Sequence, residues 1–160
     1  MHQTDRPLHR PWVGAPPSPS EAPSLYVGLL PRRCLAYLID IVIVATIGLC
    51  LGFILAVMGL LTLGLLSPLA AIILALWPIA YHSFFLASRG ATPGMRLFGL
   101  EARAWEGSPL NPLQAIIVTA LFYVTVSLTA WLILLVALFN ERGRTLHDIL
   151  ANTVIIRLRA

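Results

Sequence analysis

The sequence predicts an all-α membrane protein, a helical bundle of two clear transmembrane helices plus a third long apolar segment. Of its 160 residues, 58% are hydrophobic and 11% are charged, whereas about a quarter of the residues of soluble domains are charged. Asp40 and His82 are the only acidic residues, basic residues or histidines between positions 34 and 88. One crossing takes about 20 apolar residues, so this run predicts two spans, over residues 31–60 and 67–88.

The third apolar segment covers residues 113–139. As one helix it would be about 40 Å long, too long for one upright crossing and short for two. It is therefore either a single tilted span or a re-entrant hairpin broken near residues 125–129. The hairpin is favoured because it returns the arginine-rich tail, residues 140–160, to the side on which the segment begins.

The polar loop 89–112 and the tail each contain a strand-like stretch. Residues 97–104 alternate loosely in polarity, and residues 153–159 are rich in β-branched side chains, which favour strands. If both lie on one side of the membrane, they can pair as a small β-sheet.

Arginine placement predicts the orientation, since the chain contains no lysine. Arg32 and Arg33 precede the first span, and Arg89, Arg96 and Arg103 follow the second. Cytoplasmic loops carry the excess of basic residues, so the N-terminus and the polar loop are expected on the cytoplasmic side of the inner (plasma) membrane. Because these arginines flank apolar segments, we expect them to contact lipid headgroups and not nucleic acid.

The chain divides into two parts. Residues 1–28 are polar and rich in proline, which predicts a disordered cytoplasmic tail. Residues 29–160 form the predicted membrane domain. Within its first span, Cys34 and Cys50 would be about 24 Å apart along a helix, so they cannot form a disulfide with each other.

Asp40 is the first candidate functional residue, because a charged aspartate at the centre of a span costs about 2.5–3.5 kcal/mol. Arg33 lies seven residues before it, on nearly the same helical face but about 10.5 Å away along the axis. His82 is at a similar depth if the two spans are antiparallel. His82, Arg33 and Arg96 are therefore the alternative partners for the carboxylate.

The stretch "ATPGMR", residues 91–96, follows the second span. Two interpretations stay open for Thr92, Pro93 and Gly94. One is a rigid turn whose free N–H groups, together with Arg96, hold an anion or a lipid phosphate. The other is a helix stop followed by an ordinary turn.

The stretch "RTLHD", residues 144–148, also allows two interpretations. Thr145 resembles an N-cap, and Asp148 three residues later completes a capping box for a short helix. Alternatively, Asp148 forms a cytoplasmic polar cluster with Arg33 or Arg96. His147 lies beside it and is a supporting candidate.

Three stretches together resemble the RDD family of small bacterial membrane proteins, named for an arginine and two aspartates. They are "RCLAYLID" at 33–40, "ATPGMRLFGL" at 91–100 and "TLHDILANTVIIR" at 145–157. The resemblance covers residues 29–157 and implies that Arg33, Asp40 and Asp148 are the naming residues. It also implies a multi-spanning membrane module of largely undefined activity, for which transport of unidentified ligands is the usual suggestion. Met95 departs from the pattern, where family members often carry lysine.

The sequence predicts two alternative functions. The leading one is a small transporter or channel-like module for an ion, a proton or a small solute, working as a homo-oligomer through the Arg33, Asp40 and Asp148 cluster. The alternative is a structural or accessory membrane protein that scaffolds or regulates a partner complex. No catalytic motif, metal-binding motif or cofactor-binding motif is present, so we expect neither an enzyme nor a bound cofactor.

Overall fold

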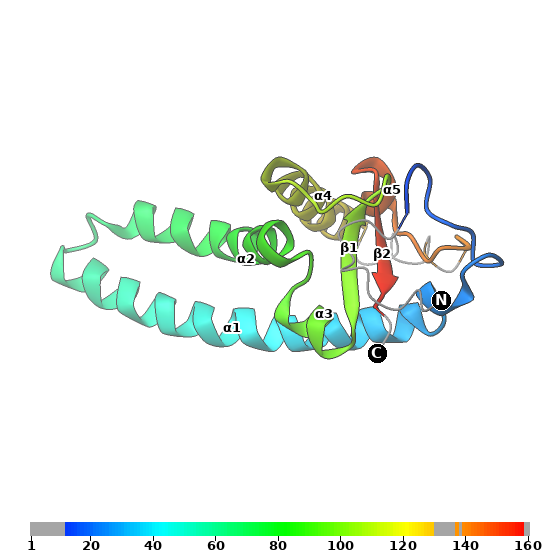
Figure 1. The fold of residues 1–160 in the computed structure, drawn as a ribbon. Coiled ribbons are helices and arrows are strands. Elements are labelled where there is room, and N and C mark those ends of the chain that lie inside the picture. The colour runs from blue at the N-terminus through cyan, green and yellow to red at the C-terminus, as the bar shows by residue number, and fades with distance from the viewer. Residues whose placement is uncertain (1–11, 130–136, 138, 159–160) are drawn as a thin grey trace.

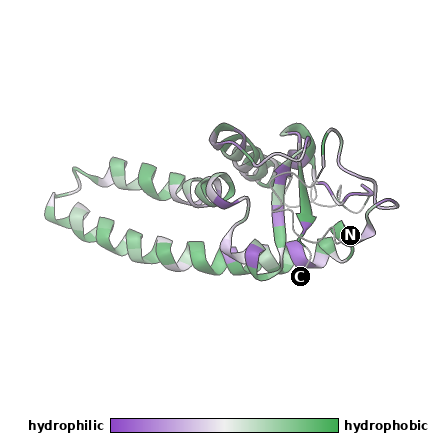
Figure 2. Ribbon diagram, in the orientation of Figure 1, coloured by the Kyte–Doolittle hydropathy of each residue, from purple (hydrophilic) through white to green (hydrophobic). Residues whose placement is uncertain are grey.

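The computed structural model describes residues 12–129, 137 and 139–158. Helix α1 (Leu29–Leu61) runs along the whole molecule, and α2 (Ser67–Arg89) returns antiparallel to it from the far end (Figure 1). Both are long and apolar enough to cross a membrane, and most of their residues are hydrophobic (Figure 2). The two predicted spans are therefore present as helices; α1 is longer than predicted by two residues at its start and one at its end, and α2 by one residue at its end.

Small residues allow α1 and α2 to pack closely. A Cβ atom placed on Gly48 would lie 3.5 Å from the Trp77 ring, and one on Gly52 would lie 3.8 Å from Leu74. The Trp77 indole N–H also donates to the Val44 carbonyl over 3.1 Å. Small side chains at helix interfaces favour such contacts in membranes, where the hydrophobic effect does not drive helices together.

The two strand-like stretches pair, as predicted. Strands β1 (Leu100–Ala104) and β2 (Thr153–Arg157) form an antiparallel two-stranded sheet, with Leu100 opposite Arg157 and Ala104 opposite Thr153. The sheet lies beside the first turns of α1 (Figure 1). It brings the loop and the C-terminal tail to the same end of the molecule.

Two short helices flank this sheet. Helix α3 (Pro93–Leu97) lies between α2 and β1, within the stretch predicted as loop, and packs on α1. Helix α5 (Leu146–Leu150) precedes β2. The core at this end contains buried apolar side chains from α1, α3 and the sheet, among them Ala36, Met95 and Leu100.

The third apolar segment begins as helix α4 (Pro112–Thr129). It packs against α2 and α5, with the Tyr123 ring 5.8 Å from that of His82 and the Phe122 ring 5.0 Å from that of His147. The hairpin break was expected near residues 125–129, but α4 is helical through these residues. The rest of the segment, residues 130–136 and 138, lies outside the described residues. The number of crossings stays a prediction.

Residues 12–28, part of the segment predicted to be a disordered tail, make hydrogen bonds in the structure, and residues 1–11 of that segment lie outside the described residues. The Trp12 indole N–H donates to the Trp105 carbonyl over 2.8 Å, and the Tyr26 hydroxyl donates to the Pro17 carbonyl over 3.0 Å. A short 3-10 helix, η1 (Pro23–Leu25), then leads into α1. The Trp12 bond and the packing of η1 against β2 place this segment at the sheet end of the molecule, whereas the Tyr26 bond lies within the segment itself.

Candidate functional site

Asp40 is buried inside the fold, with 2% of its surface exposed. Its Oδ1 accepts hydrogen bonds from the Tyr81 hydroxyl and the Gly94 backbone N–H, each over 3.0 Å. Its Oδ2 accepts from the Thr92 hydroxyl over 2.5 Å. Two hydroxyl groups and one backbone amide, from α2 and from the start of α3, therefore satisfy the acid within the protein.

None of the three partners predicted for Asp40 bonds to it. Arg33 binds Asp148 instead, and Arg96 is exposed. The His82 Nδ1 atom lies 2.9 Å from the Pro78 carbonyl and 3.2 Å from the Tyr123 hydroxyl. The prediction was wrong because it considered only charged and imidazole groups, whereas Tyr81, one residue before His82, presents its hydroxyl to the carboxylate.

The turn after α2 resolves the two interpretations of "ATPGMR". Thr92 is the N-cap of α3, its hydroxyl accepting the Met95 N–H over 3.2 Å, and Pro93 is the first helical residue. The Gly94 N–H is used by Asp40. The anion that this turn holds is therefore the protein's own carboxylate, and the Arg96 side chain lies outside the arrangement, exposed at the surface.

Arg33 and Asp148 form an ion pair between α1 and α5. The Arg33 Nη2 atom lies 2.7 Å from Asp148 Oδ2, and its Nη1 donates to the Gly143 carbonyl over 2.8 Å. The same Oδ2 accepts the Thr145 N–H over 3.0 Å, within a capping box at the start of α5. Asp148 thus fulfils both predicted roles at once, and the tail lies beside the arginine-bearing start of α1.

Burial and charge shift the titration of the two neighbours on α5. Burial lowers the pKa of His147 to about 4, and Arg33 adds to the decrease while Asp148 opposes it. Burial alone would raise the pKa of Asp148, but Arg33, with His147 and the Thr145 N–H, holds that pKa below its ordinary value. At neutral pH the site therefore contains a neutral imidazole beside a compensated carboxylate.

This arrangement predicts that acid destabilises the fold through His147. Its pKa falls from 6.5 in the unfolded chain to about 4 in the folded one, so only the unfolded chain gains the proton between these values. The free energy of unfolding should fall by about 3 kcal/mol as the pH drops from 6.5 to 4. Denaturant titrations in detergent at several pH values measure it.

His147→Gln is the comparison for that pH series, because glutamine does not titrate. We expect its unfolding free energy to be nearly constant over the same interval. Asp148 contributes below this interval, since its lowered pKa gives stability that is lost only as the pH falls past its ordinary value of 3.8. Equal pH dependence in both proteins would contradict the assignment to His147.

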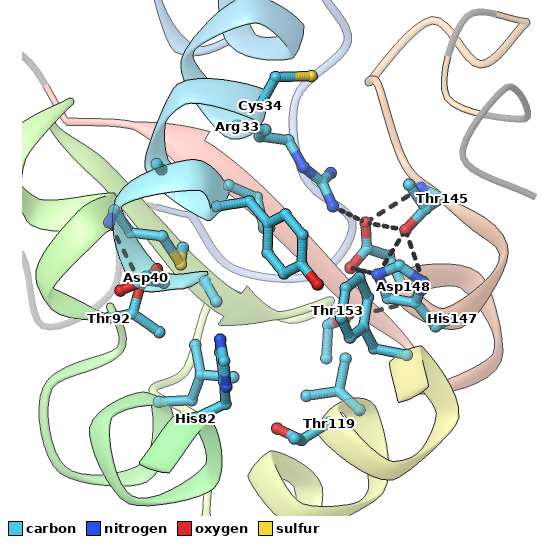
Figure 3. A pocket seen from close by; sticks show the side chains of 18 of the residues that line it. Arg33, Cys34, Asp40, His82, Thr92, Thr119, Thr145, His147, Asp148 and Thr153 are labelled. Carbon is cyan, nitrogen blue, oxygen red and sulfur yellow. Dashed lines mark hydrogen bonds and ion pairs between the residues drawn. The ribbon is translucent and has the colours of Figure 1, made fainter. Parts of the chain in front are cut away.

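Arg33, Asp40 and Asp148 line one cavity of about 390 Å³. Figure 3 shows the Arg33–Asp148 pair with Thr145 and His147 on one side of this cavity, and Asp40 with Thr92 on the other. His82 and Thr119 lie on α2 and α4, and Thr153 on β2. The three naming residues thus meet at one space, although only two of them pair directly.

Two polar groups that line the cavity could not be predicted from the sequence. The buried Thr119 hydroxyl and the His82 Nε2 atom have no hydrogen-bond partner in the structure as described. Thr119 was not a candidate, since a hydroxyl on an apolar helix carries no pattern that marks its surroundings. Among the described residues, no group of three or more His, Cys, Asp or Glu side chains could hold a metal ion.

Thr119→Val tests whether that hydroxyl is uncompensated. Valine has the same shape, so the change removes a buried polar group without a cavity, and we expect stability to stay equal or to rise by about 1 kcal/mol. Thr92→Val is the matched control, because it removes a hydroxyl that bonds Asp40 and caps α3; it should cost about 2 kcal/mol. A loss from Thr119→Val as large as that of the control would contradict the assignment.

Comparison with known proteins gives one family. The sequence profile of the RDD family matches residues 27–152. No curated protein and no solved structure shows a match to the chain.

Proposed function

The chain belongs to the RDD family, and from its geometry we propose that it is a small membrane transport module. Its cargo, an ion, a proton or a small solute, binds in the cavity that Arg33, Asp40 and Asp148 line. The observation that carries this proposal is that Arg33 and Asp40, near the start of the chain, and Asp148, near its end, line the same cavity.

Two sets of polar contacts join the helices that line that cavity. Asp40 joins α1 to α2 and to the start of α3. The Arg33–Asp148 pair joins α1 to α5. A cargo that changes the charge of either carboxylate would loosen one wall, since hydrogen bonds to charged groups contribute about 1.5–3 kcal/mol. Binding and opening would then be linked through the same residues.

The proposal extends to the setting of the module. The arginine-bearing end of α1, with the sheet and α5, would face the cytoplasm of a cell with an inner (plasma) membrane, following the positive-inside rule. A bundle of this size encloses too little for a pore, so transport would use a symmetric homo-oligomer. We assign the module no catalytic step and no nucleic-acid partner.

Asp40→Asn tests the proposal. Asparagine keeps one side-chain oxygen for Tyr81 and Gly94 and removes the negative charge. In proteoliposomes with a pH-sensitive dye and imposed sodium, potassium or chloride gradients, we expect wild-type protein to produce flux and Asp40→Asn to reduce it at least about tenfold. Loss of one tenfold step corresponds to about 1.4 kcal/mol in the transport barrier.

Glu141→Gln is the control for that measurement, because it removes an exposed negative charge outside the cavity. It should carry wild-type flux. Unchanged flux in a folded Asp40→Asn protein would refute a role of Asp40 in transport.

A second function is favoured by the completeness of the polar contacts. Both oxygens of Asp40 have donors, and Asp148 is shared between the ion pair and the capping box. A structural or accessory protein that scaffolds a partner complex needs no more than this. Under that function Asp40→Asn would lower thermal stability or partner co-purification, and wild-type proteoliposomes would show no more flux than protein-free vesicles.

A further inference from the structure

Apart from Arg33 and Asp148 on one side and Asp40 on the other, the cavity at the sheet end of α1 is mainly apolar. Its volume of about 390 Å³ lies within the range of small-molecule sites, about 300–1,000 Å³. Apolar side chains of α1, α4 and β2 line most of it: Leu30, Leu38, Ile41, Val118, Phe122 and Ile155. Away from the three charged residues, where the proposed cargo would bind, such a lining suits a lipophilic molecule better than a hydrated ion, whose lost hydration it would not replace.

The cavity can be reached from the face of α1. Three of its lining residues are exposed there, namely Cys34, Leu38 at 57% and Ile41 at 40%. They belong to a helix that is long and apolar enough to cross a membrane. In a bilayer this face contacts acyl chains, so a molecule dissolved in the hydrocarbon would meet the cavity without passing through water.

The side of the cavity formed by α2 and α4 contains two polar atoms without a hydrogen-bond partner among the described residues, His82 Nε2 and Thr119 Oγ1. The Pro78 carbonyl can only accept, so the His82 Nδ1 atom at 2.9 Å carries the proton in the neutral ring. The His82 Nε2 atom is then an acceptor, and with the Thr119 hydroxyl it has no hydrogen-bond partner among the described residues. Thr119 and Tyr123 lie on one face of α4, and Tyr123 contacts His82. The two unpartnered atoms therefore belong to the same wall.

We propose that this cavity binds an uncharged lipophilic molecule that carries a hydroxyl group and enters from the bilayer beside α1. A hydroxyl both donates and accepts, so it can serve His82 Nε2 and the Thr119 hydroxyl, while the apolar body fills the space between α1 and α4. The ligand goes beyond the proposed transport, because its binding requires no flux. A bound molecule would leave the Asp40 contacts and the Arg33–Asp148 pair intact.

Photolabelling of the full chain in phospholipid nanodiscs tests the ligand. The probe is azioctanol, an aliphatic alcohol with a photoreactive diazirine, and adducts are mapped by mass spectrometry. We expect adducts within residues 30–41 and 118–122, suppressed at least fivefold by excess octanol. Leu60 and Leu61, exposed at the opposite end of α1, should gain few adducts. Adducts that follow exposure alone, without competition by octanol, would overturn the proposal.

Three variants distinguish the contact of the ligand's hydroxyl with Thr119 from the packing of its apolar part in the cavity. Thr119→Val should reduce azioctanol labelling several-fold and leave labelling by the hydroxyl-free azioctane unchanged. Val118→Trp, which fills the cavity, should reduce labelling by both probes. Val124→Trp is the matched control, because Val124 is exposed on the same helix and does not line the cavity; it should reduce neither.

Equal labelling of the wild-type protein by the two probes would overturn the hydroxyl's role and leave only acyl-chain contact. These results are independent of the flux measurement. Saturable labelling without flux would refute transport alone, and flux without saturable labelling would refute the ligand alone.

Discussion

Replacing Gly94 by alanine is expected to lower the free energy of unfolding by about 3 kcal/mol or more. The added Cβ atom would lie 2.1 Å from the Ala36 carbonyl oxygen and 2.8 Å from Asp40 Oδ2. The first neighbour is backbone of α1, so it cannot rotate away, and α3 would have to separate from α1. Overpacking in a close-packed interior typically costs about 1–3 kcal/mol, and more where backbone must move.

Denaturant unfolding in detergent measures this effect, with Gly59→Ala as the matched control. A Cβ atom on Gly59 meets nothing nearer than the Ser67 hydroxyl at 4.0 Å, and alanine raises helix propensity by about 1 kcal/mol. The control should therefore be neutral or more stable. A Gly94→Ala protein as stable as wild type would show that α1 and α3 do not pack this closely.

Arg33→Met is expected to have an effect of similar size, about 3 kcal/mol. It leaves the Asp148 carboxylate, whose side chain is only 3% exposed, without its cation. Removing one partner of a buried ion pair costs about 3–5 kcal/mol, and the Thr145 N–H that remains on Asp148 places this case near the lower end. Thermal and denaturant unfolding both report the loss.

Two further variants identify its cause. Arg32→Met removes a neighbouring arginine that donates to the Phe98 carbonyl over 3.1 Å; one such hydrogen bond contributes about 1 kcal/mol. Adding Asp148→Asn to Arg33→Met should recover part of the loss, since no unpaired charge then remains. If the double variant is as unstable as the sum of the single ones, Arg33 and Asp148 act independently and the ion pair is not the cause.

These two predictions follow from one feature of α1. Asp40 and Arg33 are seven residues apart, two helical turns, and the spacing placed them on one face, as the sequence predicted. In the structure they serve different neighbours: Asp40 binds α2 and α3, and Arg33 binds α5. Their separation along the helix is too long for direct contact, so each recruits the element that packs at its own level.

The sequence alone determined the elements whose signals are local. The near-absence of charge predicted α1 and α2, because burying backbone in hydrocarbon requires continuous apolar helices. The β-branched run 153–159 predicted a strand. Thr145 and Asp148, three residues apart, predicted the capping box at the start of α5.

Only the tertiary structure decided which groups meet. The hydroxyl groups of Tyr81 and Thr92 and the Gly94 amide became the partners of Asp40, and the Trp12 side chain found the Trp105 carbonyl. A sequence shows where a buried charge needs a partner, because the apolar residues around a charged residue such as Asp40 are visible in the sequence. It does not show what compensates it, because hydroxyl and amide donors occur throughout the chain and only packing brings a particular one within reach.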